Sequence, residues 1–116
     1  MKMARFAIDA PDIATAAERA GRAAGLPFEQ RESDHYGPYC LIRLPGGGSI
    51  RALKNVDPVY RAELDPPEDK FFEPDFSAEQ VLIEIDTLDA TQLSEWKRIV
   101  GEVFPGAIPI DRPGDE

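Results

Sequence analysis

The sequence predicts an α+β fold with a mostly antiparallel or mixed sheet and two helices on one face. Near each end of the chain, an alternating apolar segment precedes an apolar pattern with helical spacing, over residues 3–24 and 81–104. Between these two strand–helix units, the run Pro45–Gly48 separates two further alternating segments, which is typical of a β-hairpin. The 116 residues suit one domain of this kind.

The first unit begins with a strand over residues 3–9, in which apolar side chains alternate. Asp12 favours a helix start because its carboxylate complements the helix dipole, and Gly25 favours the helix end. The apolar positions with helical spacing are Ile13, Ala16, Ala17, Ala20 and Ala24. Because this face is nearly all alanine, we expect the helix to lie close against the sheet.

The second unit begins with an alternating strand over residues 81–86. Asp89 and Gln92 have capping-box spacing at the start of a helix that ends before Pro105. The apolar stripe of this helix is Leu93, Trp96, Val100, Val103 and Phe104, so we expect Trp96 to be a core anchor. Residues 107–110 then suit a short edge strand.

The middle of the chain holds further strand candidates. Residues 39–44 and 49–54 flank the glycine-rich turn, and residues 59–64 are predicted to form one more strand. Residues 65–78 interrupt the alternation with three prolines and three phenylalanines, which indicates a long ordered loop.

The paired units resemble the split βα pseudo-repeat of ferredoxin-like folds, since Ile8-Asp9 and Ile85-Asp86 each precede a helix. The middle has too many strand candidates for a simple βαββαβ order, so we expect extra central hairpin strands. We expect residues 1–110 to form a single α+β domain and residues 111–116 to be a frayed tail.

Charge is the most distinctive compositional feature. There are 22 Asp plus Glu against 13 Lys plus Arg, which gives a net charge of -9 and an isoelectric point near 4.6. This balance opposes direct contact with nucleic acid or anionic lipid. Residues 63–89 contain ten acids and one base, so this one segment carries a net charge equal to that of the whole chain.

The cysteine content and the lengths of the apolar runs bear on disulfides, metal sites and cellular location. One cysteine, Cys40, cannot form an internal disulfide, and no zinc-ligand spacing is present. We therefore expect no metal and no cofactor. The first residues lack the pattern of a signal peptide, and no apolar run is long enough to span a bilayer, so we expect a cytoplasmic protein that does not enter a membrane.

Few residues suggest catalysis. The run Gly46–Gly48 lacks the GK[ST] ending of a phosphate loop and leads into a strand, which favours a turn. His35 beside Asp34 could act in acid–base chemistry, but an exposed loop histidine is the favoured interpretation. Cys40 could pair with His35 as a nucleophile, although its alternation places the thiol on the apolar face.

Carboxylates offer two further possibilities. Asp65, Glu68 and Asp69 could bind a hard cation, but the calcium-loop pattern is missing. Glu84 and Asp86 share one strand face and could form a hydrolytic pair, but we interpret them as exposed acids on the polar side of the strand.

The segment 63–76 combines acids with aromatics and is the candidate binding site. We expect Phe71, Phe72 and Phe76 to bury part of their area and anchor the loop. The acids expected to project outward are Glu68, Asp69, Glu73 and Asp75. Aromatic anchors with a carboxylate rim suit capture of a basic protein. The alternative is an ordinary solubilising loop. The predicted partner-binding residues are Glu63, Asp65, Glu68, Asp69, Phe71, Phe72, Glu73 and Asp75.

A small acidic α+β chain whose acid-rich stretch runs Glu63-Leu64-Asp65-Pro66-Pro67-Glu68-Asp69-Lys70-Phe71-Phe72-Glu73 resembles the immunity proteins of bacterial contact-dependent inhibition and related polymorphic toxin systems. The resemblance is one of size and charge. It implies a non-enzymatic inhibitor that occludes the active site of a cognate, commonly basic, nuclease toxin. Two alternatives remain: a ferredoxin-like small-ligand or regulatory domain with its cleft between helices and sheet, and a small enzyme using His35.

Overall fold

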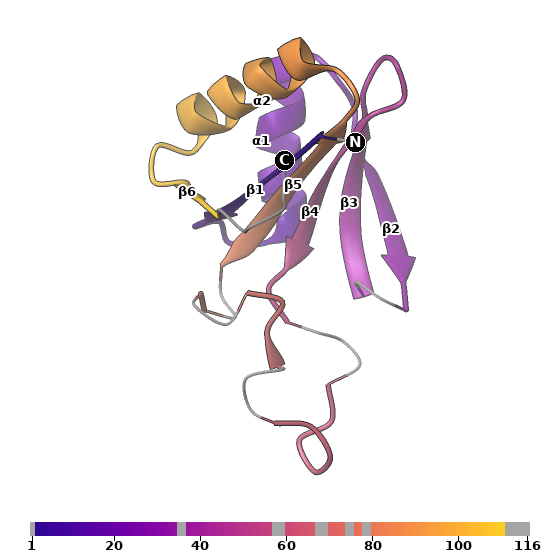
Figure 1. The fold of residues 1–116 in the computed structure, drawn as a ribbon, viewed down its shortest axis with the longest axis vertical. Helices are drawn as coiled ribbons and strands as arrows, with labels where there is room; N and C mark the ends of the chain where they lie inside the picture. Colours follow the sequence, from indigo (N-terminus) through magenta and orange to yellow (C-terminus); the bar gives the residue numbers. More distant parts are fainter. Residues whose placement is uncertain are drawn as a thin grey trace.

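The computed structural model describes residues 2–34, 37–56, 60–66, 70–73, 76–77 and 80–110. Eight elements follow one another in these residues (Figure 1). They are β1 (Lys2–Ile8), α1 (Ile13–Ala24), β2 (Glu29–Ser33), β3 (Gly37–Arg43), β4 (Ser49–Lys54), β5 (Val81–Thr87), α2 (Ala90–Val103) and β6 (Ile108–Pro109). The strands form one sheet of order β2-β3-β4-β5-β1-β6, in which all neighbours are antiparallel.

The predicted α+β class is confirmed. Strands β2 to β5 form a meander, while α1 and α2 lie side by side over one face of the sheet, α1 against β3 and β4 and α2 against β5 and β1 (Figure 1). The order β4-β5-β1-β6 is that of a split βαβ arrangement, and β2 and β3 extend the sheet beyond β4.

Both helices begin at the predicted aspartates. The Asp12 carboxylate accepts a hydrogen bond from the Thr15 N–H at 2.6 Å, which lowers the Asp12 pKa. Asp89 likewise accepts from the Thr91 and Gln92 N–H groups. Gly25 ends α1 with φ 71°, a left-handed conformation that glycine adopts without strain.

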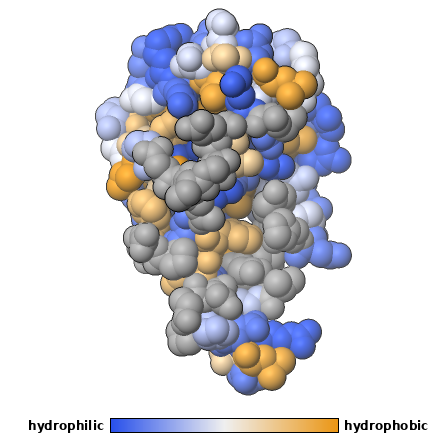
Figure 2. Space-filling view, in the orientation of Figure 1, coloured by the Kyte–Doolittle hydropathy of each residue, from blue (hydrophilic) through white to orange (hydrophobic). Residues whose placement is uncertain are grey.

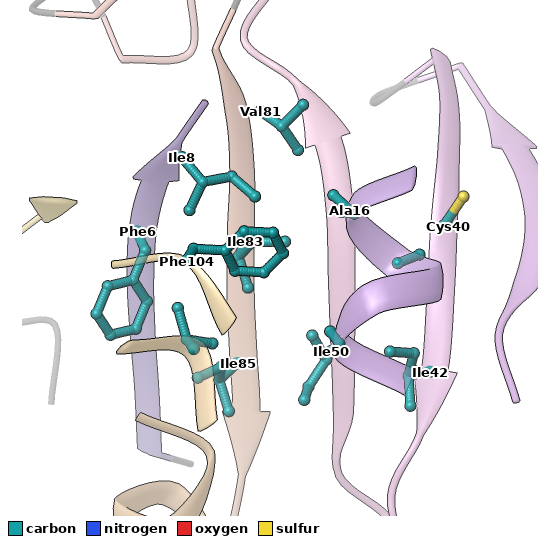
Figure 3. Packing of buried hydrophobic residues seen from close by; sticks show 14 of the residues in the cluster. Phe6, Ile8, Ala16, Cys40, Ile42, Ile50, Val81, Ile83, Ile85 and Phe104 are labelled. Carbon is teal, nitrogen blue, oxygen red and sulfur yellow. The ribbon is translucent and has the colours of Figure 1, made fainter. Parts of the chain in front are cut away.

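The main core lies between the helices and the sheet (Figure 3). Strand side chains such as Ile42, Ile50 and Ile83 supply its volume, and the alanine face of α1 lies close against them, as the sequence predicts. Trp96 is 4% exposed, which confirms its role as a core anchor of α2. A β-carbon at Gly21 would lie 2.5 Å from the Leu26 carbonyl oxygen, so only glycine fits at this point.

Two strand predictions differ from the structure. The expected strand over 59–64 is wrong for its described residues, because 62–64 form a turn. Strand β2 was not predicted, because its side chains are nearly all exposed and polar and show no alternation. Strand β2 lies at the edge of the sheet, where its backbone could pair with a strand of another chain. Its charged side chains oppose such pairing. The predicted frayed tail 111–116 lies outside the described residues.

Candidate functional site

The connection between β4 and β5 is the most unusual feature of the fold. These strands are adjacent and antiparallel, so two to five residues would join them. The chain instead uses residues 55–80, and the described parts of this connection extend beyond the end of the sheet (Figure 1). We call residues 55–80 the acidic connection, since the sequence there has eight acids and two bases.

Asn55 fastens the returning part of the acidic connection to its start. This side chain is fully buried, and its Nδ2 donates to the carbonyl oxygens of Glu73, Phe76 and Ser77 at 3.0–3.1 Å. Its Oδ1 accepts from the Glu73 N–H at 2.8 Å. One amide therefore pairs several backbone groups that would otherwise be costly to bury.

Apolar packing fastens the same returning part of the chain that Asn55 holds, and we call this whole attachment the anchor. Phe72 and Phe76 pack on a second cluster, formed on the sheet face opposite the helices by Ala7, Leu53 and Leu82. This confirms the predicted anchoring role of Phe72 and Phe76. Phe71 is half-buried, and the Lys70 ammonium lies 5.6 Å from its ring centroid.

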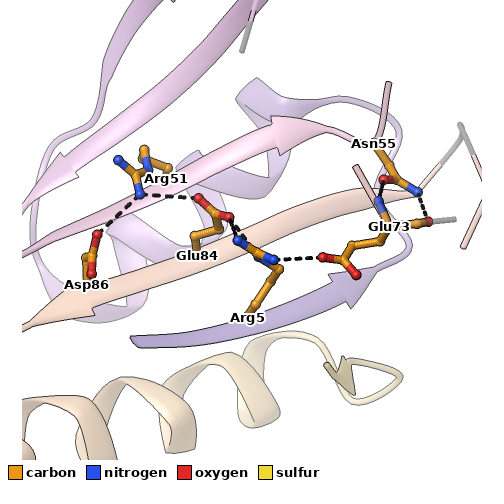
Figure 4. Close-up of polar contacts among 6 residues, drawn as sticks. All are labelled: Arg5, Arg51, Asn55, Glu73, Glu84 and Asp86. Atoms are coloured by element: carbon orange, nitrogen blue, oxygen red, sulfur yellow. Dashed lines mark hydrogen bonds and ion pairs between the residues drawn. The ribbon is translucent and has the colours of Figure 1, made fainter. Parts of the chain in front are cut away.

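A charged network crosses this sheet face beside the apolar cluster. Register places Arg5 of β1 opposite Glu84 of β5, and Glu84 opposite Arg51 of β4. Arg5 lies between two carboxylates, with its Nε 2.7 Å from Glu84 Oε2 and its Nη1 2.7 Å from Glu73 Oε2 (Figure 4). Arg51 contacts Glu84 Oε1 at 3.3 Å and Asp86 Oδ2 at 3.2 Å.

These contacts correct two expectations. Glu84 is 5% exposed and ion-paired, so its interpretation as an exposed acid is wrong. Glu73 is also 5% exposed, so it does not project outward but pairs with Arg5. Burial lowers the pKa of the Arg5 guanidinium, but Glu84 and Glu73 outweigh that effect and leave the pKa raised.

The outer part of the acidic connection contains a turn closed by its own hydrogen bonds. The Arg61 carbonyl oxygen accepts from the Leu64 N–H at 3.1 Å and from the Asp65 N–H at 2.8 Å. The Asp65 carboxylate in turn accepts from the Arg61 N–H at 2.8 Å. The Glu63 side chain is exposed, and the Leu64 side chain is 70% exposed.

The structure therefore divides the predicted site residues into two groups. Glu63 and Asp65 lie in the outer turn, whereas Phe72 and Glu73 belong to the anchor. Glu68, Asp69 and Asp75 lie outside the described residues. Sequence reasoning missed the anchoring roles of Asn55 and Arg5. The available signal is a charged residue, Arg5, in the middle of the otherwise apolar run 3–8.

The structure describes two of the other three candidate sites, the glycine-rich turn and Cys40. Gly46–Gly48 lie in the turn of the β3–β4 hairpin, as predicted. Cys40 is 1% exposed, and burial raises the pKa of its thiol. His35 lies outside the described residues, within which no cluster of three or more His, Cys, Asp or Glu could hold a metal.

The cleft expected between helices and sheet for a small ligand is filled by the main core. An open groove of about 360 Å³ lies instead along the helices, where Leu26, Trp96 and Ile99 are among the residues that line it. Glu95, Arg98 and Glu102 border it, and Arg98 is paired with Glu102.

The fold and this site define an α+β domain whose antiparallel sheet carries a long, anchored acidic connection. No protein-family model matches the chain, and no curated protein matches it. Neither α1 nor α2, the helices of the described residues, has the length and apolar character that a bilayer span requires.

Proposed function

We propose that this chain is a non-enzymatic cytoplasmic binding protein that captures a basic protein partner through the acidic connection. In keeping with the immunity proteins it resembles, the partner is a toxin whose active site the connection occludes. The observation that carries the proposal is the buried anchor, in which Asn55 and the Arg5–Glu73 pair fasten a connection that the sheet does not need.

The energetic cost of such a connection favours function over simple linkage. Ordering each additional residue costs about 1–2 kcal/mol of conformational entropy, and a short hairpin would avoid that cost. Long ordered loops on a rigid scaffold commonly carry binding sites. The buried polar anchor offsets part of the cost and holds the start and the returning part of the connection together beside the sheet.

The charge of the acidic connection indicates the chemistry of the partner. Its eight acids and two bases give a net charge of -6, while Arg5 compensates Glu73 within the anchor. The remaining carboxylates would attract a cationic surface from a distance and raise the association rate. Carboxylates held over a nuclease cleft would also occupy the positions of substrate phosphates.

The test uses the protein domain encoded by the adjoining gene, produced as a catalytically inactive variant. A triple charge reversal, Glu63→Lys, Glu68→Lys and Asp69→Lys, should slow association by about tenfold or more and weaken its dependence on salt. The matched control reverses three acids outside the connection, Glu32→Lys, Asp34→Lys and Glu95→Lys, all of which are exposed.

Both triple variants change the net charge equally, so a general charge effect would slow them alike. A larger effect of the connection variant, together with protection of growing cells by the native chain alone, supports the proposal. If the adjoining genes encode no toxin domain, or if the two triple variants associate at the same rate, the proposal is wrong.

A further inference from the structure

The outer turn of the acidic connection, residues 61–65, presents one large apolar side chain, that of Leu64, beside the small Ala62 and three charged residues. We propose that Leu64 is the apolar anchor that enters a pocket on the partner, and that cationic side chains rim that pocket. This inference rests on the proposed function. Charge attraction would bring the two proteins together, and burial of Leu64 would then supply part of the binding affinity.

The first support is that the turn closes without using the Leu64 side chain. Two hydrogen bonds to the Arg61 carbonyl oxygen and one from the Arg61 N–H to Asp65 close the turn. The leucine side chain is 70% exposed and so contributes little apolar burial to the fold. A side chain presented on a preformed turn loses less conformational freedom on binding than one on a loose loop.

The second support is position. The turn lies on the part of the connection farthest from the helices, and Figure 2 shows a hydrophobic group flanked by hydrophilic ones at that end of the molecule. A partner could therefore reach Leu64 without a clash with the scaffold. Leu88 is equally exposed, at 72%, but it lies between β5 and α2 and outside the connection.

Charge distinguishes the possible occupants. Glu63 is exposed beside Leu64, and the whole connection carries a net charge of -6. A second copy of this chain, with a net charge of -9, would be repelled, as would an anionic lipid surface. A basic protein with a leucine-sized apolar pocket would bury the exposed side chain and pair its own cationic groups with the surrounding acids.

The experiment compares Leu64→Ala with Leu88→Ala, two identical truncations at equally exposed leucines. The probe is again the inactive domain encoded by the adjoining gene, and binding is followed by surface plasmon resonance. Leu64→Ala should weaken affinity by about 30-fold or more, mainly through faster dissociation, whereas Leu88→Ala should change it less than about twofold. Both variants should keep the native melting temperature, since neither leucine is buried.

The outcomes separate the two proposals. If the domain binds the native chain but Leu64→Ala and Leu88→Ala bind alike, Leu64 is not the anchor and the proposed function stands. If the domain does not bind the native chain, both proposals fail. Sedimentation of the native chain and of Leu64→Ala tests the remaining occupant: a native dimer that Leu64→Ala abolishes would overturn the inference in favour of self-association.

Discussion

Asn55 and Glu73 are joined in both directions: the Asn55 Nδ2 donates to the Glu73 carbonyl oxygen, and the Glu73 N–H donates to the Asn55 Oδ1. The first residue after β4 thus holds the returning chain before it enters β5. The Glu73 side chain then reaches Arg5 of β1 on the sheet. Backbone and side chain of one residue therefore fix the acidic connection to two different parts of the fold.

Asn55→Ala should destabilise the protein by about 2–4 kcal/mol, because buried backbone groups of the returning chain lose their partner. The measurement is urea unfolding followed by tryptophan fluorescence. Gln80→Ala is the control: its side chain accepts one exposed hydrogen bond from the Ser77 N–H in the same connection and should cost less than about 1 kcal/mol. If the two variants lowered the free energy of unfolding equally, Asn55 would not fasten the returning chain as proposed.

Arg5→Met should destabilise the protein by about 3–5 kcal/mol, since it leaves the buried carboxylates of Glu73 and Glu84 without their main counter-charge. The matched control is Arg98→Met, which removes the same charge from an exposed pair with Glu102 and should cost less than about 1 kcal/mol. Differential scanning calorimetry at neutral pH compares the two. The role assigned to the network is wrong if Arg5→Met is no more harmful than Arg98→Met.

The sequence predicts the fold better than it predicts the site, and particular residues show why. The strands β1, β3, β4 and β5 and both helices follow from periodicity, because the side chains that each element contributes to the main core recur with that element's own spacing. Strand β2 is an exposed edge held by backbone pairing with β3, so its side chains carry no periodic signal.

The anchor is hidden for a different reason. Arg5 and Glu84 are 79 residues apart in sequence, and only the register of β1 and β5 places them opposite each other. Acids are usually solvated, so the sequence predicts an exposed Glu84 in its strand and an exposed Glu73 in its loop. Their shared partner, Arg5, is brought to them only by the fold. The acidic character of the segment around Glu63 and Asp65 is easier to recognise, because it follows from local charge alone.

Gly21→Ala in α1 should destabilise the protein by about 1–3 kcal/mol, although alanine is the better helix former. The added β-carbon would lie 2.5 Å from the Leu26 carbonyl oxygen, which is backbone and cannot swing away. Gly101→Ala in α2 is the matched control, because its β-carbon would meet nothing within 4 Å. It should stabilise the protein by about 0.5–1 kcal/mol. Opposite shifts of the urea midpoint would confirm the close approach of α1 to the chain at Leu26, and shifts of the same sign would contradict it.

Cys40 should make stability depend on pH in the alkaline range. Burial raises the pKa of its thiol in the folded chain, and the Asp12 carboxylate adds to the rise. The unfolded chain therefore loses this proton at a lower pH than the folded chain. The contribution to stability is intact below the ordinary thiol pKa and decreases as pH rises from that value through the raised one.

The measurement is the difference in unfolding free energy between the native chain and Cys40→Ala, from pH 7 to about 10, a range that includes the ordinary thiol pKa. All other titrating groups are common to both chains and cancel in this difference. The advantage of the native chain should shrink as pH rises. Because Cys40 is 1% exposed, its alkylation by iodoacetamide should also require opening of the sheet and α1. A difference that stays constant with pH, or alkylation as fast as in the unfolded chain, would show that the thiol is not buried in the main core.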